Sequence, residues 1–174
     1  MKRIAFLVIS MLLSTLCVHA QAPKRQGGTP EPPGLEYVCE LRVICEGTYT
    51  VGQTSHGTRV VIPIVGGTFE GPDMKGTILS GGADYQLVDS EHSRNEIEAI
   101  YSIKTDDGVY IHIRNTGIIY TGPGKDGQRQ FYFRLTPRFE APQDSKYAWL
   151  NNSVFICMNV PATDCICLRV WRVL

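Results

Sequence analysis

The stretch of the chain best suited to chemistry is the short segment 81–87, which reads GGADYQL. Side chains alternate across a β-strand, so Asp84 and Gln86 share one face and the apolar residues between them share the other. A carboxylate beside an amide could bind a ligand, and Asp84 could act as a general acid or base if burial raised its pKa. The alternative is that this polar face is the solvated outside of a sheet.

A second segment, 130–136 (QFYFRLT), places Tyr132 and Arg134 on one face. Arg134 could clamp a carboxylate or enolate oxygen, and Tyr132 and Trp149 could supply aromatic walls. Together with Asp84 and Gln86 these residues could form one cluster inside a barrel. The alternative is a salt bridge between Asp84 and Arg134 that only holds the sheet together, and the residues alone leave both open.

The elements that would position these side chains are short β-strands separated by turn residues. Asp-Asp-Gly at 106–108 is a strong hairpin signal, and the segment 145–152 alone favours a short helical turn. The predicted strands fall near residues 35–45, 58–65, 67–82 (two short pieces), 83–89, 96–105, 109–115 (extended by 117–122), 128–139, 153–159 and 165–173. Strand spacings of about ten residues favour an all-β fold, a single closed antiparallel β-barrel of up-and-down, calycin-like topology. Closure removes vulnerable edges, so the first and last strands should pair.

Polar faces recur on several of these strands. Glu96 and Glu98 oppose apolar neighbours, and so do His112 and Arg114. Solvated outer faces are the usual arrangement in antiparallel sheets. We therefore expect the polar faces to point outward, with a polar lumen as the alternative.

The N-terminus carries the three parts of a secretory signal peptide. Lys2 and Arg3 precede an apolar run, and small residues offer cleavage after Ala20 or Ala22. The apolar run is short for a membrane span, although a retained anchor is the alternative. We predict a signal peptide over 1–22, a flexible Pro/Gly-rich leader over 23–34 and a barrel domain over 35–174, in a periplasmic or secreted protein.

The composition narrows the class of partner. Removal of residues 1–22, which hold two basic residues and no acidic one, leaves 152 residues with 15 basic and 17 acidic side chains, a net charge of −2. Without a basic patch the chain is not expected to bind nucleic acid, and no second apolar segment is long enough to span a membrane. No phosphate loop or dinucleotide fingerprint appears, and His56, His92 and His112 lack metal-ligand spacing. We expect neither a cofactor nor a metal.

Five cysteines remain after the predicted cleavage, and export would permit disulfides. Pairing of Cys157 with Cys165 across the turn at 160–164 is one possibility. The other is pairing of Cys39 or Cys45 with Cys165 or Cys167, which would join the first strand to the last. At least one thiol would remain free, because the number is odd.

Several longer segments resemble a family of β-barrel proteins, DUF3237 (UPF0311). The matching sequence lies at 62–87, 105–117, 131–156 and in the closing LRVWRV. Family members carry Gly-Gly-Thr-Phe-Glu-Gly, Gly-Gly-Ala-Asp-Trp/Tyr-Gln, Thr-Pro-x-Phe-Glu and Tyr-Ala-Trp-Leu-Asn motifs, which correspond here to residues 66–71, 81–86, 136–140 and 147–151. The resemblance implies a closed barrel whose lumen opens at one end. It adds Asn151 to the candidate ligand-binding residues, beside Asp84, Gln86, Tyr132, Arg134 and Trp149.

Three functions follow from this interpretation. The favoured one is an exported barrel that binds a small molecule in its lumen. The second is a cofactor-independent acid–base enzyme, such as a cyclase, isomerase or lyase acting on a small hydrophobic or carbonyl compound, in which Asp84 and Arg134 would be catalytic. The third is a structural or interaction protein whose lumen is filled by its own side chains. The sequence leaves the ligand and the oligomeric state open.

Overall fold

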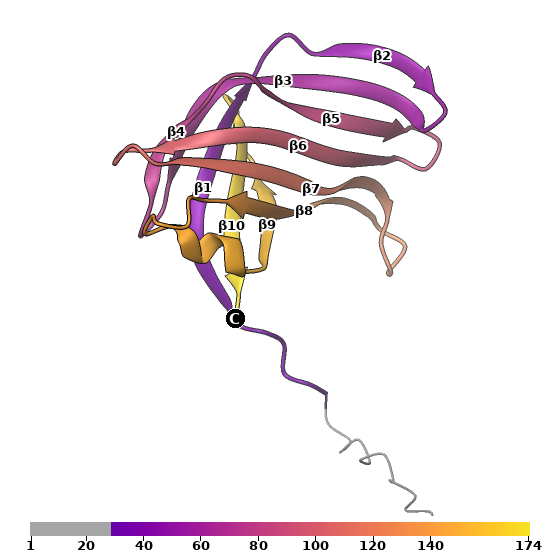
Figure 1. Cartoon of the computed structure of the whole chain (residues 1–174). Helices are drawn as coiled ribbons and strands as arrows, with labels where there is room; N and C mark the ends of the chain where they lie inside the picture. The colour runs from indigo at the N-terminus through magenta and orange to yellow at the C-terminus, as the bar shows by residue number, and fades with distance from the viewer. Residues whose placement is uncertain (1–28) are drawn as a thin grey trace, which may run out of the picture. The chain divides into compact units, whose positions relative to one another are not determined.

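Alternating apolar and polar residues produce ten β-strands and one 3-10 turn in the computed structural model, which describes residues 29–174 (Figure 1). Residues 33–174 form one unit. The elements are β1 (Leu35–Cys45), β2 (Tyr49–Thr54), β3 (Gly57–Glu70), β4 (Lys75–Ile78), β5 (Gly82–Asp89), β6 (Arg94–Thr105), β7 (Tyr110–Pro123), β8 (Arg129–Glu140), η1 (Ala148–Asn152), β9 (Phe155–Val160) and β10 (Ile166–Val173). The predicted hairpin at Asp106–Gly108 joins β6 to β7, and the predicted helical turn appears as η1.

The strands close into an antiparallel barrel with eight positions around its wall. The order runs from β1 through β10, β9, β8, β7 and β6 to the position shared by β4 and β5 and then to β3, which pairs with β1 again. The first and last strands pair as expected, with Leu41 opposite Leu168. The predicted up-and-down barrel is confirmed.

Two wall positions are each shared by two strands. β1 and β2 follow one another along β3, and β4 and β5 follow one another between β3 and β6. Within the described chain, β2 has no partner besides β3, and β9 meets β8 at Arg134 and Leu135 alone. The barrel is therefore closed along one part of its length, while β2, β3, β5, β6, β7 and β8 continue beyond it as an open curved sheet (Figure 1).

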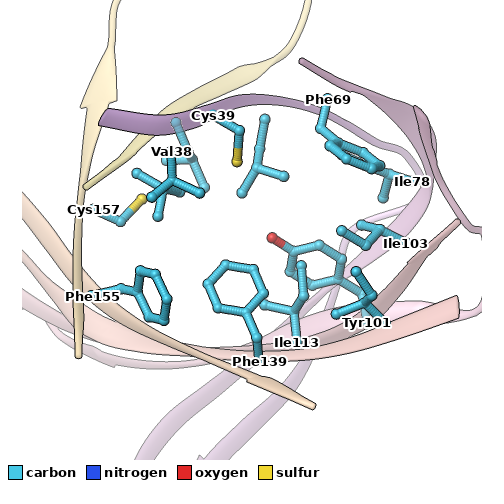
Figure 2. Packing of buried hydrophobic residues seen from close by; sticks show 14 of the residues in the cluster. Val38, Cys39, Phe69, Ile78, Tyr101, Ile103, Ile113, Phe139, Phe155 and Cys157 are labelled. Atoms are coloured by element: carbon cyan, nitrogen blue, oxygen red, sulfur yellow. The ribbon is translucent and has the colours of Figure 1, made fainter. Parts of the chain in front are cut away.

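The closed part is filled by apolar side chains. Figure 2 shows Phe69, Ile103, Ile113 and Phe155 pointing from different walls toward a common centre. Ile103 and Ile113 are fully buried, and the rings of Phe139 and Phe155 meet edge to face at 4.9 Å. Packing of this density leaves little room for a ligand in the closed part.

The predicted signal peptide (1–22), with its cleavage positions after Ala20 or Ala22, lies outside the described residues. So does the first half of the predicted leader, residues 23–28. The periplasmic or secreted location therefore stays a prediction.

The two glycines of GGADYQL lie where the wall position passes from β4 to β5. Gly81 adopts a φ of 103°, which favours glycine, and its N–H donates to the carbonyl of Ile64 at 3.3 Å. A Cβ on Gly82 would lie 2.4 Å from the Cβ of Tyr101. The pair thus allows β5 to re-enter the sheet close against β6.

We predict that Gly82→Ala lowers the free energy of unfolding by about 1–3 kcal/mol, because the added methyl must displace β5 from β6. Gly34→Ala is the matched control, since its Cβ would sit at an ordinary 3.4 Å from Leu174. Urea denaturation monitored by circular dichroism measures both. Equal midpoints for the two variants would contradict this account of the β5 entry.

Candidate functional site

A cavity of about 150 Å³ lies where the closed part of the barrel gives way to the open sheet. β1 ends there at Cys45 and β10 begins there at Ile166, so the wall on that side stops while β3, β5, β6, β7 and β8 continue. Most of the lining is apolar: Val43, Ile62, Ile64, Ile97, Ala99, Ile119, Phe133, Leu135, Ile166 and Leu168. Five polar or titratable side chains complete it: Cys45, Asp84, Gln86, Tyr101 and Asn115.

Asp84 and Gln86 face this cavity, so the expectation that their polar face points outward is wrong for β5. The expectation holds on β6 and β7, where Glu98 and Arg114 form an ion pair outside the barrel while Ile97, Ala99, Ile111 and Ile113 point inward. Tyr85, on the other face of β5, is exposed. Among β5, β6, β7 and β8, β5 alone turns its polar face into the barrel.

A gap in the ladder between β5 and β6 explains how a carboxylate fits there. The register runs from Ala83↔Ile100 to Asp84↔Ala99 and resumes only at Leu87↔Glu96. Within the gap, the backbone N–H of Glu98 donates to Oδ1 of Asp84 at 3.2 Å. On the outer side, Nη1 of Arg59 donates to the carbonyl of Tyr85 at 2.6 Å. Side chains therefore satisfy backbone groups that the ladder leaves unpaired.

A chain of hydrogen bonds orients the Asp84 carboxyl. Nδ2 of Asn95 donates to Oε1 of Gln86 at 3.2 Å, and Nε2 of Gln86 donates to Oδ2 of Asp84 at 2.7 Å. Asp84 therefore accepts two hydrogen bonds, one from Gln86 and one from the Glu98 backbone. The carboxyl is thus held in one orientation, beside the apolar lining.

Burial dominates the electrostatics of the site. It raises the pKa of Asp84, and the hydrogen bonds from Gln86 and the Glu98 backbone oppose that rise only in part. Among residues 29–174, no Lys, Arg or His side chain forms an ion pair with Asp84. Burial, and then the negative charge of Asp84, raises the pKa of the Cys45 thiol, so Cys45 is a poor nucleophile at neutral pH.

Two polar residues in the lining were missed by sequence reasoning. The Tyr101 hydroxyl and both side-chain polar atoms of Asn115 are buried and make no hydrogen bond within the described part of the chain. The Cys157 thiol lies near the Asn115 amide, outside hydrogen-bond geometry. In Figure 2 the Tyr101 oxygen points into the barrel interior. The sequence did offer one indication of Asn115, because it follows Ile111 and Ile113 on the same, otherwise apolar face of its strand.

Arg134 and Tyr132 share a face, as predicted, but that face is the outer one. Phe133 and Leu135 line the cavity, so alternation sends their neighbours outward. Nη1 of Arg134 donates to the carbonyl of Phe133 at 2.9 Å, and its guanidinium lies 5.2 Å from the Tyr132 ring centroid. The alternative of an Asp84–Arg134 salt bridge is therefore wrong, and the structure does not bring Arg134 to Asp84 as a catalytic partner.

Trp149 and Asn151 lie beyond the other end of β8, away from the cavity. Asn151 accepts from the Ala141 N–H at 2.8 Å and donates to the Ala141 carbonyl at 2.9 Å, which ties η1 to the end of β8. Trp149 packs beside Phe155 and under the guanidinium of Arg172. Both residues help to cover the packed end of the barrel, so of the candidate ligand-binding residues the cavity contains Asp84 and Gln86 alone.

The five cysteines of the described chain are free thiols. The strand register pairs Cys157 with Val170 rather than Cys165, and it places Arg42 rather than a cysteine opposite Cys167. Cys39 also lies opposite Val170, and Cys45 opposite Ile64. Burial raises the pKa of both Cys39 and Cys157 to about 12. No predicted disulfide pair is aligned in the structure, and oxidation of these thiols stays a prediction.

Residues 29–174 contain neither a metal-binding cluster nor a membrane-spanning helix. No group of three or more His, Cys, Asp or Glu side chains is placed to hold a metal ion. In the same part of the chain, no helix is long and apolar enough to cross a membrane.

The family model described as "Protein of unknown function (DUF3237)" matches residues 33–173, which spans the entire barrel. The chain belongs to the DUF3237 family. A UPF0311 protein of Clostridium acetobutylicum is 31% identical over 148 residues, which cover 79% of this chain and 92% of that protein. A UPF0311 protein of Rhodopseudomonas palustris is 33% identical over 154 residues, 82% of this chain and 99% of the relative.

Solved structures of similar chains have the same fold. A β-barrel-like protein from Acinetobacter baumannii is 31% identical with a TM-score of 0.73, and the match covers 84% of this chain and 99% of that one. An enzyme from Penicillium herquei matches at 21% identity with a TM-score of 0.68, over 85% of this chain and 99% of that one. At that identity the likeness concerns the fold alone. The function proposed for this DUF3237 protein therefore rests on the geometry and chemistry of its cavity.

We predict that Asp84→Asn changes the pH dependence of stability. The folded protein holds the Asp84 proton to a higher pH than the ordinary pKa of 3.8, so the wild type loses stability as the pH rises from 3.8 through the raised pKa. The variant lacks this loss. The free energy of unfolding of Asp84→Asn, minus that of the wild type, should therefore increase between acid and neutral pH.

Urea denaturation of both proteins at a series of pH values measures this difference. Glu96→Gln, on the outer face of β6, controls for removal of one negative charge. A difference between Asp84→Asn and wild type that does not change with pH would show that Asp84 titrates normally.

We predict that Tyr101→Phe leaves the free energy of unfolding unchanged or raises it, because the removed hydroxyl is buried and has no hydrogen-bond partner among the described residues. Tyr147→Phe is the matched control. The Tyr147 hydroxyl donates to Oδ1 of Asp107 at 2.9 Å, so its removal should cost about 1 kcal/mol. Equal losses in the two variants would mean that the Tyr101 hydroxyl has a bound partner even without added ligand.

Proposed function

We propose that this protein binds a small, mostly apolar molecule in the cavity at the open end of its barrel, and that it does so outside the cytoplasm, as the N-terminal leader predicts. One observation carries the proposal. Asp84, Gln86, Tyr101 and Asn115 face an otherwise apolar cavity, and the last two are buried without hydrogen-bond partners in the described chain. Unpaired buried polar groups are costly unless something pairs with them.

The size and chemistry of the cavity suit a compact ligand. An apolar cavity of about 150 Å³ accommodates a benzene-sized molecule. Small-molecule sites are commonly apolar pockets in barrel mouths, with a few polar groups that set orientation. Asp84 and Gln86 on β5, and Tyr101 and Asn115 on β6 and β7, could serve that purpose here. A purely structural protein would have no need to keep these polar groups in the interior.

Acid–base catalysis on such a ligand is the second candidate. Burial raises the pKa of Asp84 toward the range in which a carboxyl group can both accept and release a proton. The barrel from Penicillium herquei is described as an enzyme, so the fold is compatible with catalysis. Arg134 lies on the outer face, so Asp84 would act without it. Loss of turnover with retained binding in Asp84→Asn would support this candidate.

We predict that Ala99→Leu blocks the cavity. Ala99 lines it opposite Asp84, so a larger side chain should fill the space without removing any polar group. With benzyl alcohol as the probe, wild-type protein should show shifts in the side-chain amide signals of Gln86, Asn95 and Asn115 by NMR, and Ala99→Leu should not.

Ala162→Leu is the matched control, because Ala162 is exposed in the turn between β9 and β10 and does not line the cavity. It should respond to benzyl alcohol as the wild type does. Equal amide shifts in Ala99→Leu and the wild type would place the probe elsewhere and overturn the proposal.

A further inference from the structure

The Asp84 carboxylate has acceptor capacity that the protein leaves unused. An ionised carboxylate offers about four lone-pair sites. Nε2 of Gln86 occupies one oxygen and the Glu98 backbone N–H the other. The structure thus leaves roughly two acceptor sites on a carboxylate that borders the cavity.

No charge in the lining balances this carboxylate. Cys45 and Tyr101 are the other titratable groups in the lining, and burial raises the pKa of both, which keeps them neutral. Arg59, on the adjacent strand β3, is directed to the Tyr85 carbonyl on the outer face. Glu96 and Glu98 also extend outward, to Arg94 and Arg114. When Asp84 is ionised, the cavity therefore carries one negative charge in apolar surroundings.

Gln86 stabilises the negative charge of Asp84 through a single hydrogen bond. Asn95 occupies its Oε1, which leaves its Nε2 to donate to Asp84. The remaining walls offer hydrocarbon and the Phe133 ring. Such a site disfavours an anion, because two negative charges would be buried together, and it favours a ligand that brings a positive charge.

We infer that the ligand class of the cavity is a small primary amine, whose ammonium group pairs with Asp84 while its apolar body lies against the Phe133 wall. This inference rests on the proposed function, since it specifies the occupant of the same cavity. An ammonium ion has three donors and no acceptor, which matches the free acceptor sites of Asp84. A polar group at the far end of the amine could reach Tyr101 and Asn115, which line the same cavity.

Two probes of nearly equal size test the inference. Benzylamine and benzyl alcohol differ in one atom and in charge. On the wild-type protein at neutral pH, we expect benzylamine to bind about tenfold tighter or more, because hydrogen bonds to charged groups are stronger than neutral ones. Benzoate should not bind. Titration calorimetry, with the amide signals of Gln86 and Asn95 to locate each probe, measures all three.

The variants separate the carboxylate from general surface charge. In Asp84→Asn, benzylamine should lose its advantage while benzyl alcohol still binds, which also shows that the variant is folded. In Glu96→Gln, which removes an exposed carboxylate from the neighbouring strand, the advantage should remain. If Asp84→Asn fails to fold, the wild-type affinity for benzylamine at pH 4 and pH 7 replaces it, and a loss of preference at the acid pH is expected as Asp84 takes up a proton.

The outcomes distinguish this inference from the proposed function. Equal affinities for benzylamine and benzyl alcohol, with both probes located in the cavity, would overturn the amine inference and leave the binding function standing. Tighter binding of benzylamine than of benzyl alcohol that persists in Asp84→Asn would also overturn it, because the ammonium group would then pair with a residue other than Asp84. Failure of both probes to shift the cavity amides would count against the proposed function itself.

Discussion

The pairing of β1 with both β10 and β3 is the interaction on which the rest of the structure depends. It closes a meandering sheet into a barrel, and it does so only as far as Cys45, where β1 ends. In the closed part of the barrel, which ends at that residue, the wall is complete and the interior is filled by apolar side chains (Figure 2). Beyond the closed part, the sheet continues on one side alone. The cavity exists because closure stops before the long strands β3, β6, β7 and β8 do.

The position of Asp84 illustrates how a locally unfavourable feature is maintained. An ionised carboxylate in apolar surroundings destabilises a fold unless hydrogen bonds or an opposite charge compensate it. Here two donors compensate Asp84 in part, one from a ladder gap that β5 and β6 leave open and one from a glutamine held by Asn95. The missing positive charge is the part of this arrangement that a ligand could supply. Stability and the proposed binding therefore make opposite demands on the same residue.

The motif residues of the family divide into two physical roles. Gly82, Asp84 and Gln86 belong to one motif and shape the cavity, through close strand approach and polar lining. Trp149 and Asn151 belong to another and cover the packed end, where Asn151 ties η1 to β8 through both polar atoms of its amide. The family resemblance alone could not separate these roles, because a motif preserves packing as readily as it preserves a site.

The sequence by itself determined the strands, the hairpin at Asp106–Gly108, the helical turn and the barrel class, because alternation and turn residues are local properties that a single chain displays. It also determined that Asp84 and Gln86 share a face, as do Tyr132 and Arg134. Only the tertiary structure decided which face of each strand points inward. That choice depends on the curvature of the closed sheet and on which partners lie across it, and neither is visible within one strand. For the same reason the burial of Tyr101 and Asn115 without hydrogen-bond partners among residues 29–174 became apparent only once the strands were assembled, and Arg134 came to lie on the outside.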